Sequence, residues 1–412
     1  MTDNTSCRNA PLSHIRVLDL GRIMAAPWAT QMFADLGAEV IKIERPRIGD
    51  DTRAWGPPFL TDKDGKPTQE SGYYLSVNRG KRSVTVDITR PEGQAIVREI
   101  AKTADVVIEN FKVGALARYG LDAQSLRALK PDLVYCSVTG FGQSGPRRDQ
   151  AAYDFAIQAM GGLMSVTGER DDLPGGGPQK VGVPVIDMMT GMYAAVAILA
   201  ALARRAATGA GETIDLAMLD VASAFLANQA MNHLISGRVP RRGGNRHPNI
   251  QPQDVFASRN GKFVLAVGND LQFVKLCDVL GCQPWAKDPR FSSNAARVGA
   301  EAELTRLLSH ECGSWDREKL LAALDAAGVP AAPINTVPEV FADPQIIHRG
   351  MLMHLRHPSG LVPQVISPMK FADAPLTFDR APPLLGADTA AVLAEIGIDV
   401  REQERLAAAE VI

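Results

Sequence analysis

The chain has 412 residues, 46% hydrophobic and 22% charged, an ordinary balance for a globular protein of roughly two or three domains. Its net charge of −2 gives no electrostatic reason to bind nucleic acid or an anionic membrane. The five scattered cysteines match neither a disulfide framework nor the spacing of a zinc site, and the N-terminal residues lack the apolar core of a signal peptide. We therefore expect a cytoplasmic protein without a metal site.

The first 140 residues alternate between short apolar strands and helices. Helices are predicted from Pro27 to Leu36, over 89–104 and over 123–129, and strands at 15–20, 40–43, 83–88, 105–108 and 133–138. This alternation predicts an α/β fold with a doubly wound, mostly parallel, Rossmann-like sheet. Ligands of such sheets bind at the carboxyl ends of the strands, which here carry residues 21–24, 44–45, 110–111 and 139–142. The first of these loops has one glycine and no G-x-G-x-x-G motif, which argues against dinucleotide binding.

The stretch from Val183 to Arg205 combines one acid with a long apolar run. Asp187 precedes Met188–Ala203, 16 residues without a charge, which predicts a buried helix too short in apolar length to cross a bilayer. A helix N-terminus carries partial positive charge, so we expect it to keep this acid ionised. Asp187 is then either a helix cap or a nucleophile, and local pattern alone favours the cap.

The second half of the chain changes in character. A helix is predicted over 153–163, a long helix over 214–237, and an antiparallel hairpin after it with its turn at Asn260–Gly261. We expect a large α/β domain over 1–210, a linker helix over 211–240, a smaller α+β domain over 241–330, and a return to the large domain over 331–412.

Several stretches taken together resemble one family, the class III CoA-transferases of the formyl-CoA and carnitine CoA-transferase type. They occur in the family's order over nearly the whole chain: PLSHIRVLDLGR, ADLGAEVIKIERP, NRGKRSVTVDI, PEG, ADVVIENF, SVTGFGQSGP, YDFAIQAMGGL, the Asp187 stretch, GETIDLAMLD and PPLLGADT. The resemblance implies a large and a small domain and a homodimer of two interlocked chains. It also implies that coenzyme A is used as a substrate, in acyl-CoA, rather than held permanently.

The resemblance aligns Asp187 with the catalytic aspartate of the family. In the family this carboxylate attacks an acyl-CoA thioester, and an aspartyl-CoA thioester then passes CoA to an incoming acid. The aligned CoA-contacting residues are Arg45, Asn110, Phe111 and Arg118. Packing alone would explain Phe111 equally well, and either arginine would also fit a plain surface position.

Other aligned residues fall near the acyl group. Asp154 matches a family acid at that site, although a helix-terminal acid would look the same. Gly243 and Gly244 fall in the loop that closes over the aspartyl intermediates in the family. Met24 stands where the formyl-transferring branch has glutamine, and because methionine cannot donate the same hydrogen bonds, a formyl substrate is not expected.

The loop GGNRHPNIQP indicates the acyl acceptor. It looks more like the branches that use succinyl-CoA and dicarboxylates, in which Arg246 and His247 would hold a distal carboxylate. A solvated basic loop is the alternative interpretation.

Two rival functions remain open. The superfamily includes α-methylacyl-CoA racemases, which need a histidine where this chain has Tyr153, and a phenol is a poor base at neutral pH. A non-catalytic CoA-binding protein is the other alternative, although the presence of Asp187 argues against it.

Overall fold

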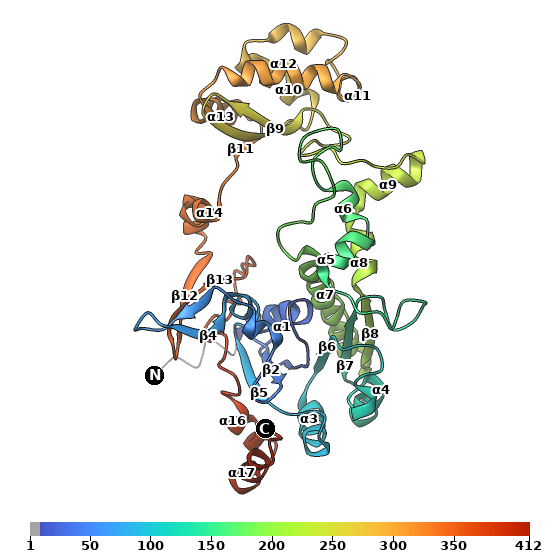
Figure 1. The fold of residues 1–412 in the computed structure, drawn as a ribbon, viewed down its shortest axis with the longest axis vertical. Coiled ribbons are helices and arrows are strands. Elements are labelled where there is room, and N and C mark those ends of the chain that lie inside the picture. The colour runs from blue at the N-terminus through green and yellow to red at the C-terminus, as the bar shows by residue number, and fades with distance from the viewer. Residues whose placement is uncertain (1–8) are drawn as a thin grey trace. The chain divides into compact units, whose positions relative to one another are not determined.

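The computed structural model describes residues 9–412 (Figure 1). Contacts divide these residues into two compact units. The first comprises the described residues up to Gly162, together with Gly182–Ala227 and Gln345–Ile412, and the second comprises Leu163–Val181 and Asn228–Pro344. The domain boundaries expected at 210, 240 and 330 remain predictions.

The first unit is built on a six-stranded parallel sheet in the order β5-β2-β1-β6-β7-β8. Its strands are β1 (Arg16–Asp19), β2 (Glu39–Glu44), β5 (Lys81–Thr85), β6 (Val106–Glu109), β7 (Val134–Thr139) and β8 (Glu212–Ala217). This is the doubly wound order, in which the chain reverses direction across the sheet between β1 and β6. The predicted sheet is confirmed, with strand ends that differ by one to three residues.

Helices cover both faces of this sheet. On one face, α1 (Ala25–Asp35) and α7 (Val185–Thr208) bury a cluster that includes Phe33 and Ile198. On the other face the cluster is shared by α3 (Pro91–Thr103), α4 (Ala123–Leu129), α16 (Thr389–Glu395) and α17 (Val400–Ala408). The C-terminal helices reach the sheet because Asp388 and Thr389 make hydrogen bonds beside β5 (Figure 1).

Short elements complete the first unit. They are η2 (Asp51–Ala54), β3 (Phe59–Thr61), β4 (Pro67–Ser71), α2 (Gly72–Leu75), η3 (Ala117–Tyr119), α5 (Asp154–Met160), α8 (Met218–Phe225), α15 (Pro344–His348), β12 (Leu352–His357) and β13 (Gly360–Val365).

The second unit is a small α+β domain with a core of its own. Its sheet has the antiparallel order β11-β10-β9, and the predicted hairpin is β9–β10 with its turn at Arg259–Asn260, one residue earlier than expected. The elements are α6 (Leu163–Val166), α9 (Ala227–Ser236), β9 (Gln253–Ser258), β10 (Gly261–Ala266), α10 (Asp270–Leu280), η4 (Gln283–Lys287), α11 (Asn294–Gly299), α12 (Glu301–Gly313), α13 (Arg317–Ala327), β11 (Ala331–Pro333) and α14 (Val337–Ala342).

The long helix predicted over 214–237, and with it a linker helix over 211–240, is wrong. Residues Glu212–Ala217 form β8, which pairs with β7 as the sixth strand, and two helices follow, interrupted at Ala227 with φ +43°. Pairing with an open sheet edge outweighs the helix propensity of the alanines and leucines in this segment.

The apolar helix α7 is buried on one side only. Ile186, Thr190, Ala194, Ile198 and Leu202 are among its buried residues. A second stripe is exposed in this chain: Met192 (44%), Tyr193 (45%), Val196 (61%) and Leu199 (36%). The expectation of a helix buried on all sides is therefore wrong for the single chain. By length and composition α7 also passes the test for a membrane span, a test that core helices of soluble proteins pass as well.

Candidate active site

A cavity of about 180 Å³ lies where the sheet reverses direction, at the carboxyl ends of β1, β6 and β7. Its lining joins four segments: Arg22–Ala25, Asn110–Val113, Val138–Gly140 and Arg148–Tyr153, with Asp187 and Met218. This is the position at which doubly wound sheets bind ligands. Asp187, Met24, Asn110, Phe111 and Tyr153, five of the residues named from the sequence, therefore share one cavity.

Asp187 is the third residue of α7, and it does not cap the helix. The N-cap is Pro184, and the cap bonds come from Asp154 at the start of α5. Oδ1 of Asp154 accepts the backbone N–H groups of Ile186 at 2.7 Å and Asp187 at 3.1 Å, while Oδ2 of Asp154 accepts a hydrogen bond from Gln158 Nε2 at 2.6 Å. These three bonds occupy the Asp154 carboxylate, so it supports the helix terminus on which Asp187 stands.

The pKa of Asp187 is raised from 3.8 to about 7, chiefly by burial and then by the charge of Asp154. The expectation that the helix N-terminus keeps this acid ionised is therefore wrong. The two N–H groups that would have stabilised its charge are already bonded to Asp154, whose negative charge adds repulsion. Asp187 is thus a half-buried carboxyl group that changes protonation near neutral pH.

Asn110 and Met24 belong to the wall of the cavity. Asn110 Oδ1 accepts the Arg22 N–H at 2.9 Å, and Asn110 Nδ2 donates to the Arg22 carbonyl at 2.8 Å. The amide of Asn110 therefore holds the loop after β1 in place. Met24, only 6% exposed, is the N-cap residue of α1 at the end of that loop. Tyr153 lines the cavity at 62% exposure, and its hydroxyl has no hydrogen-bond partner among the residues that the structure describes.

A second, smaller cavity of about 40 Å³ shares Arg22 and Phe111 with the first and is also lined by Arg45. Arg22 lies over the Phe111 ring at 5.3 Å and pairs with Asp51 at 3.1 Å, and Arg45 pairs with the same Asp51 at 2.9 Å. Two guanidinium groups and an aromatic face next to the Asp187 cavity suit a nucleotide phosphate and its base. Arg22 was not identified from the sequence.

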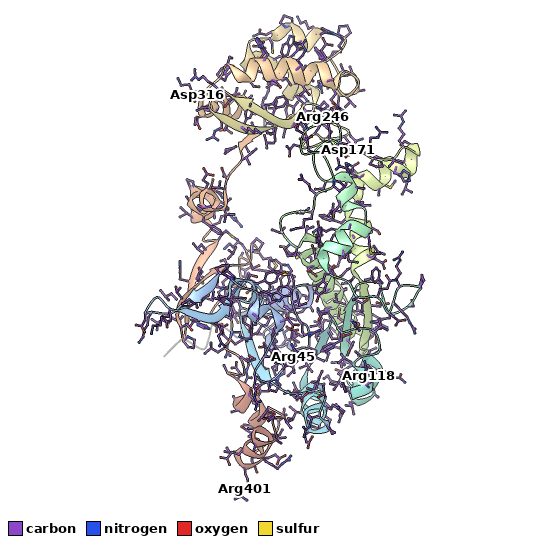
Figure 2. The ribbon with its side chains drawn as sticks, viewed as in Figure 1. Arg45, Arg118, Asp171, Arg246, Asp316 and Arg401 are labelled. Atoms are coloured by element: carbon purple, nitrogen blue, oxygen red, sulfur yellow. The ribbon has the colours of Figure 1, made fainter. Side chains whose placement is uncertain are left out.

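Arg118 lies apart from both cavities. It is exposed in η3, and neither the Asp187 cavity nor the Arg45 cavity includes it (Figure 2). Its contact with CoA remains a prediction from the family resemblance.

Tyr73 was also missed by the sequence analysis. The pKa of its phenol is raised to about 12 by burial and by the charges of Asp187, Asp154 and Asp50, and its ring packs edge-on against Trp55 at 5.1 Å. It is therefore a neutral hydroxyl group in the field of the cavity acids. Its motif, YYLSVN, precedes the stretch that carried the family resemblance, and no spacing rule pointed to it.

The predicted acyl-site loop lies in the second unit, beside its own cavity of about 630 Å³. Gly244 has φ +65°, a conformation in which side chains are strained, and a Cβ there would lie 2.9 Å from Glu169 Oε1, so this position favours glycine. Gly243 has more room. His247 Nδ1 accepts the Asn249 N–H at 3.1 Å.

The basic residues of this loop are largely neutralised. Arg246 forms ion pairs with Glu301 and, at 3.6 Å, with Asp254, and Arg242 pairs with Asp171. Arg241 lines the same cavity, is exposed, and forms no ion pair with the residues that the structure describes. Arg246 and His247 were named from the sequence as carboxylate ligands, and Arg241 is a third candidate.

Among residues 9–412 no group of three or more histidine, cysteine, aspartate and glutamate side chains is placed to hold a metal ion. The four described cysteines are free and buried.

Comparison with known proteins identifies the family of this chain. A family model described as CoA-transferase family III matches residues 12–389. A succinate–glutarate CoA-transferase of Agrobacterium fabrum is 51% identical over 397 residues, 96% of this chain and 98% of the relative. The human succinyl-CoA:glutarate CoA-transferase is 39% identical, covering 94% of this chain and 86% of the relative. The crystal structure of a CaiB/BaiF family protein from Brucella suis superposes with a TM-score of 0.82 at 50% identity, covering 94% of this chain and 100% of that one. The chain therefore belongs to CoA-transferase family III.

Proposed function

We propose that the protein transfers CoA from succinyl-CoA to a dicarboxylic acid, with glutarate as the first candidate, through covalent catalysis by Asp187. The observation that supports Asp187 most directly is its place in the cavity at the sheet's reversal point, half-buried and without a hydrogen-bond partner for its carboxyl group among the described residues. The names of the similar proteins from A. fabrum and human support the substrate pair.

The proposed sequence conserves atoms and charge. The Asp187 carboxylate attacks the succinyl thioester carbonyl, the C–S bond breaks, and CoA leaves as thiolate. The thiolate attacks the aspartyl carbonyl of the mixed anhydride, which releases succinate and leaves an aspartyl-CoA thioester. The acceptor carboxylate then attacks this thioester, and the released thiolate attacks the new acyl group. The acceptor leaves as its CoA ester, and the Asp187 carboxylate is regenerated.

Residues of the first unit support the proposed binding of CoA and the covalent step. We propose that Arg22, Arg45 and Phe111 bind the nucleotide of CoA, since they form one cluster beside the cavity of Asp187. Burial, which raises the pKa of Asp187, also limits the water that would hydrolyse the anhydride and the thioester. In the second unit, we propose that Arg246, His247 and Arg241 bear on recognition of the distal carboxylate.

The function is tested with succinyl-CoA as donor and a panel of mono- and dicarboxylic acids, read by mass spectrometry of the CoA esters. Formation of the dicarboxylate ester by the wild-type protein, and none above background by Asp187→Asn, is the expected result. Asn keeps the shape of the side chain but cannot attack the thioester. No ester with any acid would contradict the proposal, and deuterium uptake at the α-carbon without transfer would indicate racemisation instead.

We also propose that the protein is a homodimer in the cytoplasm. The exposed apolar stripe of α7 supports an association of copies, because a stripe of four large apolar side chains on one helix is costly to leave in water. The free cysteines agree with a reducing compartment.

A further inference from the structure

The loop that joins β1 to α1, Gly21–Met24, holds a backbone conformation that its sequence disfavours. Ile23 has φ +71°, in the left-handed region that β-branched residues avoid. Arg22, Ile23 and Met24 all line the cavity of Asp187. Something outside the loop must therefore hold it in this shape, and the shape of the loop decides the shape of the cavity.

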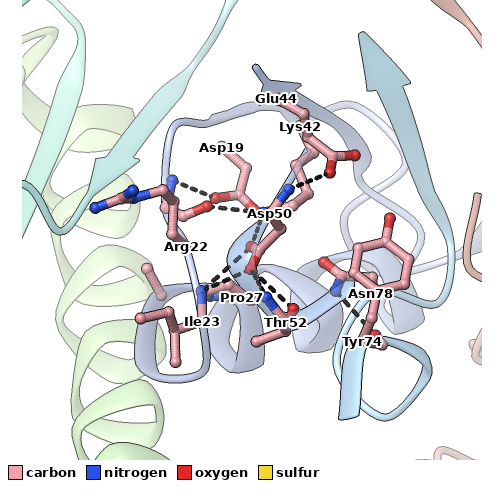
Figure 3. A network of polar contacts seen from close by, with 12 residues as sticks. Asp19, Arg22, Ile23, Pro27, Lys42, Glu44, Asp50, Thr52, Tyr74 and Asn78 are labelled. Atoms are coloured by element: carbon pink, nitrogen blue, oxygen red, sulfur yellow. Dashed lines mark hydrogen bonds and ion pairs between the residues drawn. The ribbon is translucent and has the colours of Figure 1, made fainter. Parts of the chain in front are cut away.

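Side chains from elsewhere in the first unit bond five consecutive backbone groups of the loop. Figure 3 shows Asp19, Lys42 and Asp50 gathered at this loop. Asp19 accepts the Gly21 N–H at 2.8 Å, and Lys42 Nζ donates to the Gly21 carbonyl at 2.7 Å. Asn110 bonds both groups of the next residue, as described above. Asp50 accepts the Ile23 N–H with both oxygens, at 3.3 and 3.2 Å. The carboxylate of Asp50 therefore holds Ile23, the strained residue, by its backbone N–H.

Lys42 and Asp50 are joined to each other as well as to the loop. Their ion pair measures 2.9 Å, and both side chains are 0% exposed. Burial alone would raise the pKa of Asp50, but the charge and hydrogen bond of Lys42, together with two bonds from Thr52, bring it well below its ordinary value. The pair therefore stays charged, and it connects the loop after β1 to strand β2 and to the segment that follows β2.

A buried ion pair is weak evidence for a role in stability, because apolar or neutral groups of the same shape often serve as well. The contacts of this pair suggest another role, since outside the pair the two side chains bond the Gly21 carbonyl, the Ile23 N–H and Thr52, and the loop that holds Gly21 and Ile23 borders the cavity of Asp187. We propose that Lys42 and Asp50 are positioning residues for the transfer reaction: their ion pair holds Gly21–Met24 in the conformation that shapes the acyl site beside Asp187. The inference rests on the transferase function proposed above.

The test compares three variants with a matched control pair. Asp50→Asn removes one charge, Lys42→Met leaves Asp50 unpaired, and Lys42→Met with Asp50→Asn removes both charges at similar volume. The control is Arg79→Met with Asp35→Asn, which removes an ion pair of 2.8 Å that is equally buried, at 2% and 3% exposure, and makes no bond to the loop. Readouts are the melting temperature, kcat and KM for succinyl-CoA, and amide hydrogen exchange over residues 20–28.

We expect Lys42→Met to lower the melting temperature and the neutral double variant to regain most of it. In the double variant kcat should still fall about 100-fold with little change in KM, as for a misplaced reacting group, and exchange over residues 20–28 should rise. The control pair should change the melting temperature but neither kcat per folded molecule nor that exchange. Recovery of kcat together with melting temperature would overturn the proposal.

Two further outcomes are decisive. If the double variant does not fold, Asp50→Asn alone should still lower kcat at least about tenfold at unchanged KM, and unchanged kcat would refute the role. Hydrogen exchange does not depend on transfer. Suppose that the wild-type protein transfers CoA to no acid, yet hydrogen exchange over residues 20–28 rises only in the Lys42 and Asp50 variants. The proposed function then fails, while the role of the ion pair in holding the loop is supported.

Discussion

Asp187 shares the first turn of α7 with the carboxylate of Asp154, which takes the N–H groups of Ile186 and of Asp187 itself. Because Asp154, on another helix, accepts these N–H groups, the carboxyl group of Asp187 lines the cavity without bonds to its own turn. The cost is a pKa near 7, because burial and a neighbouring negative charge both disfavour the ionised form.

The pH dependence of transfer follows from this arrangement. Because only the carboxylate attacks, kcat/KM for succinyl-CoA should rise about tenfold per pH unit up to a pKa near 7 and then level off. Asp154→Asn keeps an oxygen for the helix N–H groups but removes the charge, so this limb should move to lower pH. An acidic limb that stays in place would show that Asp154 does not act on Asp187.

The stability of the folded protein should change with pH in the direction opposite to the transfer activity, falling as the pH rises. The folded-state pKa of Asp187 is raised, so its contribution to stability is greatest below pH 4 and is lost as the pH rises through about 7. The ionised, buried group then destabilises the fold by at most about 4 kcal/mol. Asp187→Asn should therefore raise the melting temperature at pH 8 and leave it almost unchanged at pH 4, measured by calorimetry at both values.

Recognition of the distal carboxylate also belongs to the scale of single residues. Arg246→Ala should raise KM for a dicarboxylate acceptor more than for a monocarboxylate of equal length. Arg241→Ala is the cleaner comparison, because Arg241 forms no ion pair with the described residues, whereas removing Arg246 leaves Asp254 and Glu301 without their partner. Equal effects on both acids in both variants would remove the loop from substrate recognition.

At the scale of elements, the approach of α7 to α1 decides where Asp187 lies. Gly191 permits this approach: a Cβ there would lie 2.7 Å from the Ala25 carbonyl oxygen and 2.9 Å from the Trp28 ring. Ala25 also lines the cavity, so the same contact joins the helix that carries Asp187 to the opposite wall of its cavity.

Replacing this glycine should therefore separate the two helices. Gly191→Val is expected to destabilise the protein by about 1–3 kcal/mol through overpacking and to lower kcat in the molecules that remain folded. Gly299→Val is the matched control, because this helical glycine has no atom within 4 Å of its Cβ position. Denaturant unfolding and steady-state kinetics of both variants make the comparison, and equal behaviour would contradict the packing argument.

The elements of the sheet could be predicted from the sequence because apolar periodicity and helix-terminal residues report local structure directly. Strand β8 could not, since Ile214 and Leu216 alternate within a segment rich in alanine and leucine, and only the open edge of β7 makes it a strand. The cap by Asp154 could not be predicted either, because it joins residues 32 and 33 positions apart.

At the scale of the whole molecule, the family resemblance supplied what local patterns could not, namely the role proposed for Asp187 and the use of acyl-CoA as a substrate. The effect of the Asp154 charge on Asp187 and the ion pairs of Arg246 could not be predicted from the sequence. They join residues whose positions in the chain have no characteristic spacing. Helix α7 is apolar in composition, yet one of its faces is exposed in the single chain. Its composition therefore did not predict how much of it is buried.

The dimer proposal is tested at this scale. Val196→Glu places a charge in the exposed stripe of α7, where it should shift the molar mass measured by light scattering from dimer toward monomer. Leu129→Glu, on α4 at 46% exposure, serves as the control and should leave the mass unchanged. A wild-type protein that is monomeric at micromolar concentration would contradict the proposal.

The central claim is that Asp187 carries CoA during transfer. The most direct measurement is to mix the protein with succinyl-CoA in the absence of an acceptor acid, quench with acid, and map the adduct by peptide mass spectrometry. The account predicts CoA in thioester linkage on the peptide that contains Asp187, absent from Asp187→Asn and discharged by added glutarate. An adduct on another residue, or full transfer activity with no adduct at Asp187, would contradict it.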